Sequence, residues 1–250
     1  MDLDIAGRVA LVSAASQGIG RAVAEALIAE GATVAISARN ADRTACVAAE
    51  IGAAAGYAWD TDDLDGAETL VRRVCDDVGE IDILVTNTGG PPTGSDPLAF
   101  SDEQWEHAHR SLVMAPVALA RLVVPGMRRR GWGRIVGISS ISAREPISVL
   151  MLSNAERSAT LAAYKTLALE LAGDGITVNT LLTGSIATER SASIHGSMEA
   201  AERAAAASVP VGRIGRPHEM GWAAAFLSSE RAAFITGSAL AVDGGVLRGL

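Results

Sequence analysis

Cysteine, lysine and long apolar runs are all scarce in this sequence. Its 250 residues include only two cysteines, Cys46 and Cys75, which are too few for a disulfide framework, so a reducing cytoplasm is the location we expect. The most apolar stretch, residues 112–127, is interrupted by Arg121 and is shorter than the roughly 18 apolar residues of a membrane-spanning helix. The first four residues lack the basic flank of a signal peptide. These absences predict a protein with no membrane partner.

Positive charge is also in deficit. The formal net charge is −8, and a nucleic-acid-binding protein needs a basic face, so nucleic acid is excluded as an expected partner. Lys165 is the only lysine in the chain. No other ammonium is therefore available for lysine-dependent chemistry.

The apolar residues follow a regular order along the chain. They make up 49% of it, and their β-rich runs lack polar alternation, which predicts strands covered on both faces, as in a parallel sheet. Helical patterns alternate with these runs, so we expect an α/β fold of the Rossmann type, a doubly wound parallel sheet with helices on both faces. The expected strands are 8–13, 33–37, 56–59, 81–86, 134–139, 176–182 and 238–242, and the expected helices are 19–30, 41–53, 64–78, 103–130, 154–172 and 217–229. Because no linker or repeat interrupts the pattern, we interpret residues 1–250 as a single domain.

A glycine-containing turn connects the first expected strand to the first expected helix. It reads Ser13-Ala14-Ala15-Ser16-Gln17-Gly18-Ile19-Gly20. In such a turn, backbone N–H groups can approach a pyrophosphate at the positive end of the helix, and we expect Ala14, Ser16, Gln17 and Ile19 to contact a dinucleotide. An ordinary strand-to-helix turn is the alternative, since two glycines alone are weak evidence. Ala14 also stands where the tight turn normally has a glycine.

Three further strand ends support the dinucleotide interpretation. Arg39 ends the second strand, where a guanidinium can pair with the 2′-phosphate of NADP, so NADP(H) is favoured over NAD(H). A solvated surface arginine is the other interpretation of that residue. Asp60 is placed to meet the adenine edge, and Asn87, Thr88 and Gly89 follow the next strand, where polar groups can line the ribose.

The sequence resembles the short-chain dehydrogenase/reductase family over nearly all of its length, and most closely the β-ketoacyl-acyl carrier protein reductases. The matching segments are Ser16-Gln17-Gly18-Ile19-Gly20, Asp60, 86–89, 175–179, Gly184 with Thr188, 210–219, 235–237 and 242–245. The resemblance implies a Rossmann-type fold, a nicotinamide cofactor that Gly184, Ile186 and Thr188 help to bind, a small-molecule substrate, and a homodimer or homotetramer. In the family, the helices that correspond to 103–130 and 154–172 pair across a two-fold axis.

The resemblance also shows where four catalytic residues are expected, and three of them differ here. The family uses a tyrosine that passes a proton to the substrate, a lysine four residues later that lowers the tyrosine pKa, a serine, and an asparagine. Counting back from 175–179 and forward from Ser140 both place the tyrosine position at Ser153 and the lysine position at Arg157. The asparagine position falls on Ser111, and only the serine, Ser140, is kept.

No neighbouring residue takes over the missing chemistry. Tyr164 lies eleven positions beyond Ser153, roughly 16 Å further along a helix, so we interpret it as a packing residue. Arg157 keeps the positive charge but is a very weak acid, and the aliphatic hydroxyl of Ser153 ionises negligibly at neutral pH. A loss of about 10²–10⁴-fold in rate is the scale expected when a positioned general acid is removed.

One long insertion, residues 184–216, follows the sixth strand at the end of the sheet where ligands bind, and we expect it to form a lid over the substrate. It includes an alanine-rich helical piece near 198–207, and residues 189–208 carry no charge signature for an acidic substrate. Three hypotheses remain. The first is an NADP(H)-linked oxidoreductase acting on a carbonyl or alcohol through a non-standard site. The second is a catalytically inactive nucleotide-binding module, such as a sensor or partner subunit. The third, non-redox chemistry in the same cleft, has no positive support.

Overall fold

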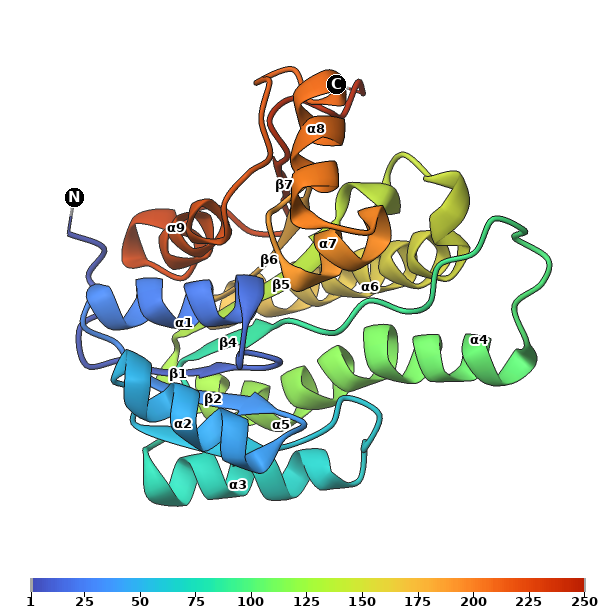
Figure 1. Ribbon diagram of the computed structural model, residues 1–250. Coiled ribbons are helices and arrows are strands. Elements are labelled where there is room, and N and C mark those ends of the chain that lie inside the picture. Colours follow the sequence, from blue (N-terminus) through green and yellow to red (C-terminus); the bar gives the residue numbers. More distant parts are fainter. Residues whose placement is uncertain (1, 250) are drawn as a thin grey trace.

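The computed structural model describes residues 2–249, and its centre is a seven-stranded parallel sheet (Figure 1). The strands are β1 Val9–Val12, β2 Thr33–Ala38, β3 Ala55–Ala58, β4 Ile83–Thr86, β5 Gly133–Ser140, β6 Ile176–Thr183 and β7 Ala239–Val242. Their order across the sheet is β3-β2-β1-β4-β5-β6-β7. The order reverses between β1 and β4, and such a switch point is where open α/β sheets bind ligands. The structure confirms the expected Rossmann-type fold.

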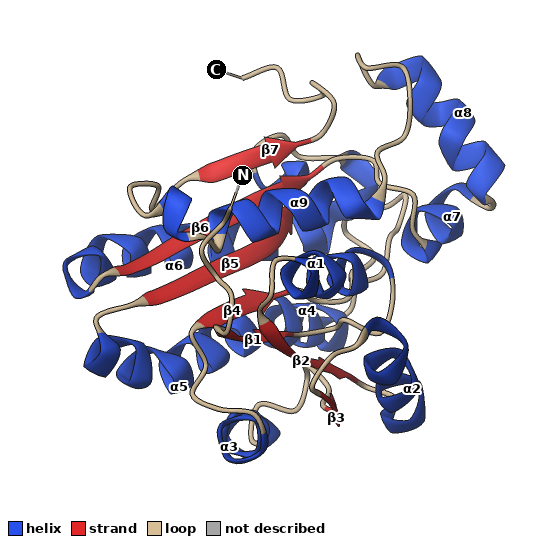
Figure 2. Cartoon of the chain, turned by 90° about the vertical axis from the view of Figure 1, so that its left-hand side faces the viewer, coloured by secondary structure: helices blue, strands red, loops and turns tan. Residues whose placement is uncertain are grey.

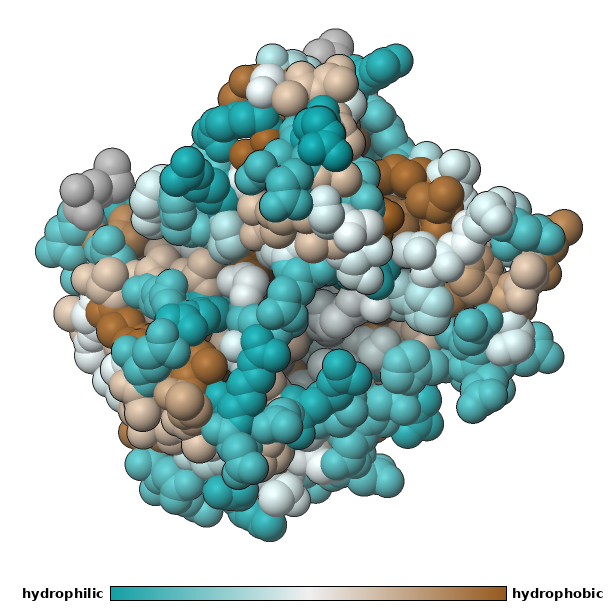
Figure 3. All heavy atoms as spheres, viewed as in Figure 1, coloured by the Kyte–Doolittle hydropathy of each residue, from teal (hydrophilic) through white to brown (hydrophobic). Residues whose placement is uncertain are grey.

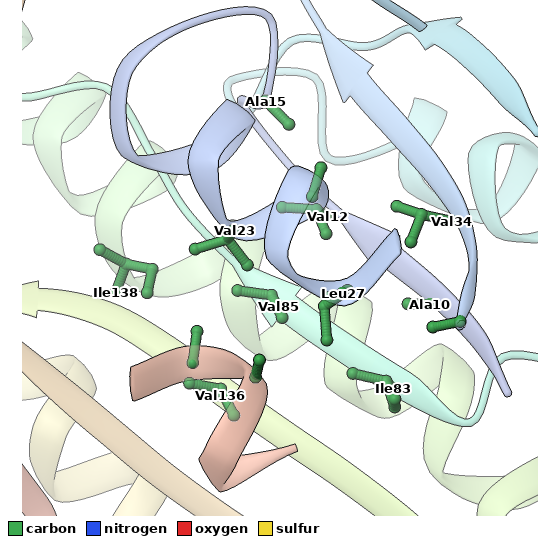
Figure 4. Close-up of a cluster of buried hydrophobic side chains, with 14 of the residues drawn as sticks. Ala10, Val12, Ala15, Val23, Leu27, Val34, Ile83, Val85, Val136 and Ile138 are labelled. Atoms are coloured by element: carbon green, nitrogen blue, oxygen red, sulfur yellow. The ribbon is translucent and has the colours of Figure 1, made fainter. Parts of the chain in front are cut away.

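Helices cover both faces of the sheet (Figure 2). Helices α1 (Gly18–Ala29), α2 (Ala41–Ile51) and α9 (Pro217–Leu227) lie on one face, and α3 (Gly66–Asp77), α5 (Ala115–Arg130) and α6 (Met151–Leu171) lie on the other. Figure 4 shows Val23 and Leu27 of α1 close to Val12, Ile83 and Val85 of the central strands, all of them buried. This packing fixes the start of α1 above the ends of β1 and β4.

The long helical run Asp102–Arg130 is not regular. Helix α4 (Asp102–His109) passes through a π-helical turn, Arg110–Met114, before α5 begins. By length and composition alone this run is the one helix among residues 2–249 that could cross a membrane, but 61% of its most apolar window is buried inside the fold. Wide turns of this kind occur often at functional sites, and this one contains Ser111.

The insertion 184–216 holds two helices, one more than the sequence predicts. Helix α8 (Met198–Ser208) matches the expected alanine-rich piece, whereas α7 (Glu189–His195) was not expected. Helix α7 begins where the Thr188 side chain accepts a hydrogen bond from the backbone N–H of Ser191, and it ends at Gly196, whose φ is 85°. A single short helix without an apolar stripe leaves little periodic signal. Figure 1 shows α7 and α8 above the carboxyl ends of the strands.

Candidate active site

The ends of β1 and β4 are joined by a small hydrogen-bond network. The Ser13 hydroxyl donates to the carbonyl of Asn87 at 2.8 Å and accepts from its backbone N–H at 3.0 Å. The Asn87 side-chain amide donates to the carbonyl of Ala14 at 3.0 Å. Asn87 therefore holds the glycine-containing turn against the end of β4, beside Thr88 and Gly89.

The turn itself is tight, and its glycine positions are sterically demanding. A Cβ atom added to Gly20 would lie 2.5 Å from the Ala14 carbonyl oxygen and 2.8 Å from the Asn87 amide nitrogen. Gln17 is the N-cap of α1 but makes no side-chain capping bond, and no acidic residue occupies the first turn. The N–H groups of Gly18 and Ile19 thus lie at a helix end that suits an anion. Ser16 lies half-buried before this end.

Ala14 carries a strained backbone in this turn. Its φ is 47°, in the left-handed region that disfavours residues with a Cβ.

We expect Ala14→Gly to raise the free energy of unfolding by about 0.5–1 kcal/mol, because relief of the strain exceeds the added entropy of the unfolded chain. Thermal and denaturant unfolding measure this change. The same substitution at Ala233, which has no positive φ, is the control and is expected to destabilise. A lower melting temperature for Ala14→Gly would contradict the strain argument.

Arg39 and Asp60 lie at the ends of neighbouring strands. Arg39 follows β2 and is exposed. The next residue, Asn40, caps α2 by accepting the backbone N–H of Arg43 at 2.8 Å. The Asp60 carboxylate accepts the N–H of Asp62. Arg43 was not singled out in the sequence, yet its guanidinium lies 3.6 Å from the carboxylate of Glu189 in α7, so α2 and the insertion meet beside Arg39.

The first residues of the insertion face the turn from the opposite side. A Cβ on Gly184 would lie 2.6 Å from the Cα of Asp243, so only glycine fits there. Ile186 is buried and pairs with Gly215 in an isolated parallel bridge. The methyl carbon of Thr188 lies 3.4 Å from the position of a Cβ on Gly18. The structure therefore brings Gly18 and Thr188 to one place, although 170 residues separate them.

Ser153 and Arg157 contact each other on the first two turns of α6. The guanidinium of Arg157 donates from Nε to the Ser153 hydroxyl at 3.1 Å and from Nη1 to the carbonyl of Ile138 at 3.2 Å. Burial, followed by repulsion from Arg190, lowers the pKa of Arg157 to about 10. The guanidinium therefore still carries its charge at neutral pH.

The two other predicted catalytic serines are engaged with the backbone. The Ser140 hydroxyl accepts the N–H of Ser142 at 3.1 Å. Ser111, in the π-helical turn, donates to the carbonyl of His107 at 2.9 Å, one turn back. A small cavity of only about 10 Å³ is lined by Thr88 from the end of β4, by Ile138 from β5 and by Arg157 from α6. Thr88 and Arg157 thus share one cavity, whereas Ser111, Ser140 and Ser153 are not among its lining residues.

Tyr164 lies in the interior, as the sequence argument expects. It is 1% exposed, its hydroxyl shares a hydrogen bond of 2.7 Å with Thr86, and its ring packs against Gly137. Burial raises its pKa above the usual value for a phenol. The neighbouring Lys165 points elsewhere and donates to the carbonyl of Gly237 at 3.1 Å. Tyr164 is therefore a packing residue, and Lys165 caps a loop.

Comparison with known proteins agrees with this geometry. The sequence model of a family described as Enoyl-(Acyl carrier protein) reductase matches residues 13–247. The chain belongs to the short-chain dehydrogenase/reductase family. It is 32% identical over 245 residues to the 3-oxoacyl-(acyl-carrier-protein) reductase FabG of Vibrio harveyi, covering 98% of this chain and 99% of that protein. It is 36% identical over 241 residues to the acetoacetyl-CoA reductase of Shinella zoogloeoides, covering 95% and 98%.

Solved structures of short-chain dehydrogenase/reductases superpose over the whole chain. The L-sorbose reductase of Gluconobacter frateurii, complexed with NADPH and L-sorbose, is 34% identical with a TM-score of 0.92, and the match covers 100% of both chains. A protein described as a putative NAD(P)-dependent gluconate 5-dehydrogenase from Beutenbergia cavernae, with bound NADP, is 32% identical with a TM-score of 0.92, again over 100% of both chains. These relatives are oxidoreductases, which agrees with the resemblance stated from the sequence.

The structure also shows the contacts of a second arginine, Arg190, that the sequence analysis did not single out. Arg190, in the first turn of α7, donates to the carbonyl of Pro91 at 2.6 Å, and its Nε atom lies 2.8 Å from the position of a Cβ on Gly90. Neither Arg43 nor Arg190 belongs to a motif of the sequence, and only the fold brings Arg43 to Glu189 and Arg190 to Pro91.

Proposed function

We propose that this chain is an NADP(H)-linked oxidoreductase that interconverts a carbonyl and an alcohol with a non-standard proton-transfer site. The observation that carries the proposal is the pair Ser153 and Arg157, joined by a hydrogen bond of 3.1 Å at the family's tyrosine and lysine positions. The segments expected to bind the dinucleotide leave no room for a Cβ atom at Gly20 or at Gly184.

NADP(H) fits the residues present. The N-terminal end of α1 is free of acidic side chains, Gly20 allows close approach of the backbone, and the exposed Arg39 ends β2. Ser16, Gln17, Ile19 and Thr188 would hold the diphosphate, Arg39 the 2′-phosphate, Asp60 the adenine edge, and Asn87, Thr88 and Gly89 the riboses. When bound, the cofactor supplies or accepts a hydride.

The roles of the chain's own residues follow from their contacts. Ser140 would hold the substrate oxygen, and Ser153 or a water would relay the proton. Arg157 would orient the cofactor ribose, since its guanidinium stays protonated at neutral pH and cannot serve as the acid. Proximity and hydride chemistry survive without a phenol, so the expected turnover is slow. Ser111 would act only through the backbone of its π-helical turn, because its hydroxyl is bonded to His107.

A nucleotide-binding module without turnover is the second candidate. Neither the aliphatic hydroxyl of Ser153 nor the charged guanidinium of Arg157 is an effective acid at neutral pH, and this favours the module. For either candidate we propose a cytoplasmic location, a single domain with residues 184–216 as its lid, and self-association through the helices of 102–130 and α6, where Leu169 is 71% exposed.

Titration calorimetry with NADPH and NADH, followed by a turnover assay, tests the proposal. We expect NADPH to bind more tightly than NADH, and Arg39→Ala to weaken NADPH binding by about 10- to 100-fold while leaving NADH binding unchanged, since a charge-assisted contact is lost. Arg72→Ala, which removes an exposed arginine of α3, is the matched control and is expected to change neither affinity.

Turnover separates the two candidates. Slow, NADPH-dependent reduction of simple ketones or acetoacetyl thioesters supports the oxidoreductase. Binding without any turnover favours the module, and reduction at ordinary family rates would show that a proton donor other than Ser153 is present. Failure to bind either nucleotide would contradict both candidates.

A further inference from the structure

Arg190 is a cation in the cleft without an anionic partner. It is half-buried, and its one hydrogen bond among residues 2–249 goes to the neutral carbonyl of Pro91. No carboxylate of the described chain lies within salt-bridge distance of it. Burial lowers its pKa. Removing a charge from water without a partner is costly, so this arrangement favours a bound anion.

Arg157 is a second cation whose hydrogen-bond partners among residues 2–249 are all neutral. Its partners, the Ser153 hydroxyl and the Ile138 carbonyl, are both neutral. Burial, followed by the positive charge of Arg190, lowers the pKa of Arg157. A desolvated cation whose partners are all neutral is stabilised by a nearby anion.

The position of Arg190 distinguishes it from the dinucleotide cradle. Thr188 faces Gly18, at the turn where a diphosphate would lie. Arg190, two residues later, extends to Gly90 and Pro91 in the loop after β4. That loop begins just after Thr88, which lines one cavity with Arg157. Figure 3 shows this face hollowed beneath α7. Arg190 therefore lies over the loop that follows β4, and Thr188 lies at the turn before α1.

We propose that Arg190 binds an oxyanion group of the substrate, either a carboxylate or a phosphate, and so selects for acidic substrates. The inference rests on the function proposed above, because it concerns the same cleft. It differs from the expectation that residues 189–208 carry no charge signature, because it assigns that role to Arg190, whose contact with Pro91 only the fold shows.

The test measures binding and needs no turnover. The chain, saturated with NADPH, is titrated by calorimetry with acetoacetate, with inorganic phosphate and with the neutral acetoacetamide. We expect at least one of the two anions to bind more tightly than acetoacetamide. Arg190→Gln should weaken the binding of that anion by about 10- to 100-fold and leave the affinity for acetoacetamide unchanged. Arg190→Lys should give an intermediate loss, because it keeps the charge and loses the two-pronged geometry.

Matched controls keep the outcome decisive. Arg203→Gln removes an exposed arginine of α8 in the same insertion and should leave anion binding unchanged, and equal melting temperatures show that the variants are folded. Equal anion affinity in Arg190→Gln and the unchanged chain, or no anion binding at all, would overturn the inference. Anion binding that occurs only in the absence of NADPH would also overturn the inference, because the arginine would then bind the diphosphate of the cofactor.

The two proposals fail in different ways. If Arg190→Gln weakens anion binding while no substrate is turned over, the anion site stands and the oxidoreductase proposal does not. If ketones that carry a carboxylate and ketones that lack one are reduced at the same rate, and Arg190→Gln changes neither rate, the oxidoreductase proposal stands and the anion site does not.

Discussion

The double substitution Ser153→Tyr with Arg157→Lys is expected to raise carbonyl reduction by about 10²–10⁴-fold, the scale of a positioned general acid. The first change supplies a phenol, and the second supplies an ammonium four residues later that lowers the phenol pKa toward the working pH. It also removes the Arg157 guanidinium, which now bonds the residue 153 hydroxyl at 3.1 Å. NADPH oxidation with an acetoacetyl thioester measures the gain.

The single variants are the controls for this prediction. Ser153→Tyr alone keeps the guanidinium, and Arg157→Lys alone keeps the aliphatic hydroxyl, so each should recover much less activity than the pair. If the double variant folds, binds NADPH and still reduces nothing, these two positions are not the whole defect. The engaged hydroxyl of Ser111 would then be the next position to change.

Gly20→Ala is expected to weaken NADPH binding by at least about 10-fold and to destabilise the fold by about 1–3 kcal/mol, because overpacking forces the backbone to move. The added Cβ would lie 2.5 Å from the Ala14 carbonyl oxygen, and the Asn87 amide that bonds this carbonyl would lie within 2.8 Å. Calorimetry with NADPH and thermal unfolding measure the two effects.

Gly173→Ala is the matched control for Gly20→Ala. A Cβ on Gly173 would meet no atom within 4 Å, and its φ is not positive, so neither NADPH affinity nor stability should fall. Unchanged NADPH affinity in Gly20→Ala would mean that the turn between β1 and α1 does not hold the cofactor.

The sequence predicts the sheet well because its strands are buried on both faces. The β-rich runs at 81–86 and 176–182 become β4 and β6 with ends shifted by at most two residues. The turn at Ala14 was also predictable, since a glycine position occupied by alanine indicates strain, and its φ is 47°. The four catalytic positions, Ser111, Ser140, Ser153 and Arg157, come from counting along the sequence and stay predictions.

The rest depends on contacts that are distant in sequence. Arg190 reaches Pro91 across 99 residues, and Arg43 approaches Glu189 across a longer stretch of chain. Neither contact has a local pattern, because a polar side chain on a short helix gives no periodic signal. The π-helical turn at 110–114 was equally hidden, since the residues on both sides of it read as one continuous helix.

The single lysine gives this chain a spectroscopic advantage. Lys165 is exposed and donates to the Gly237 carbonyl, and as the single lysine it is the one side chain that isotope-labelled methylation of side-chain amines would mark. After Arg157→Lys, the second amine would be the only new signal. Its titration by NMR would then report directly on the ionisation of the active-site cation, with Lys165 as the internal reference.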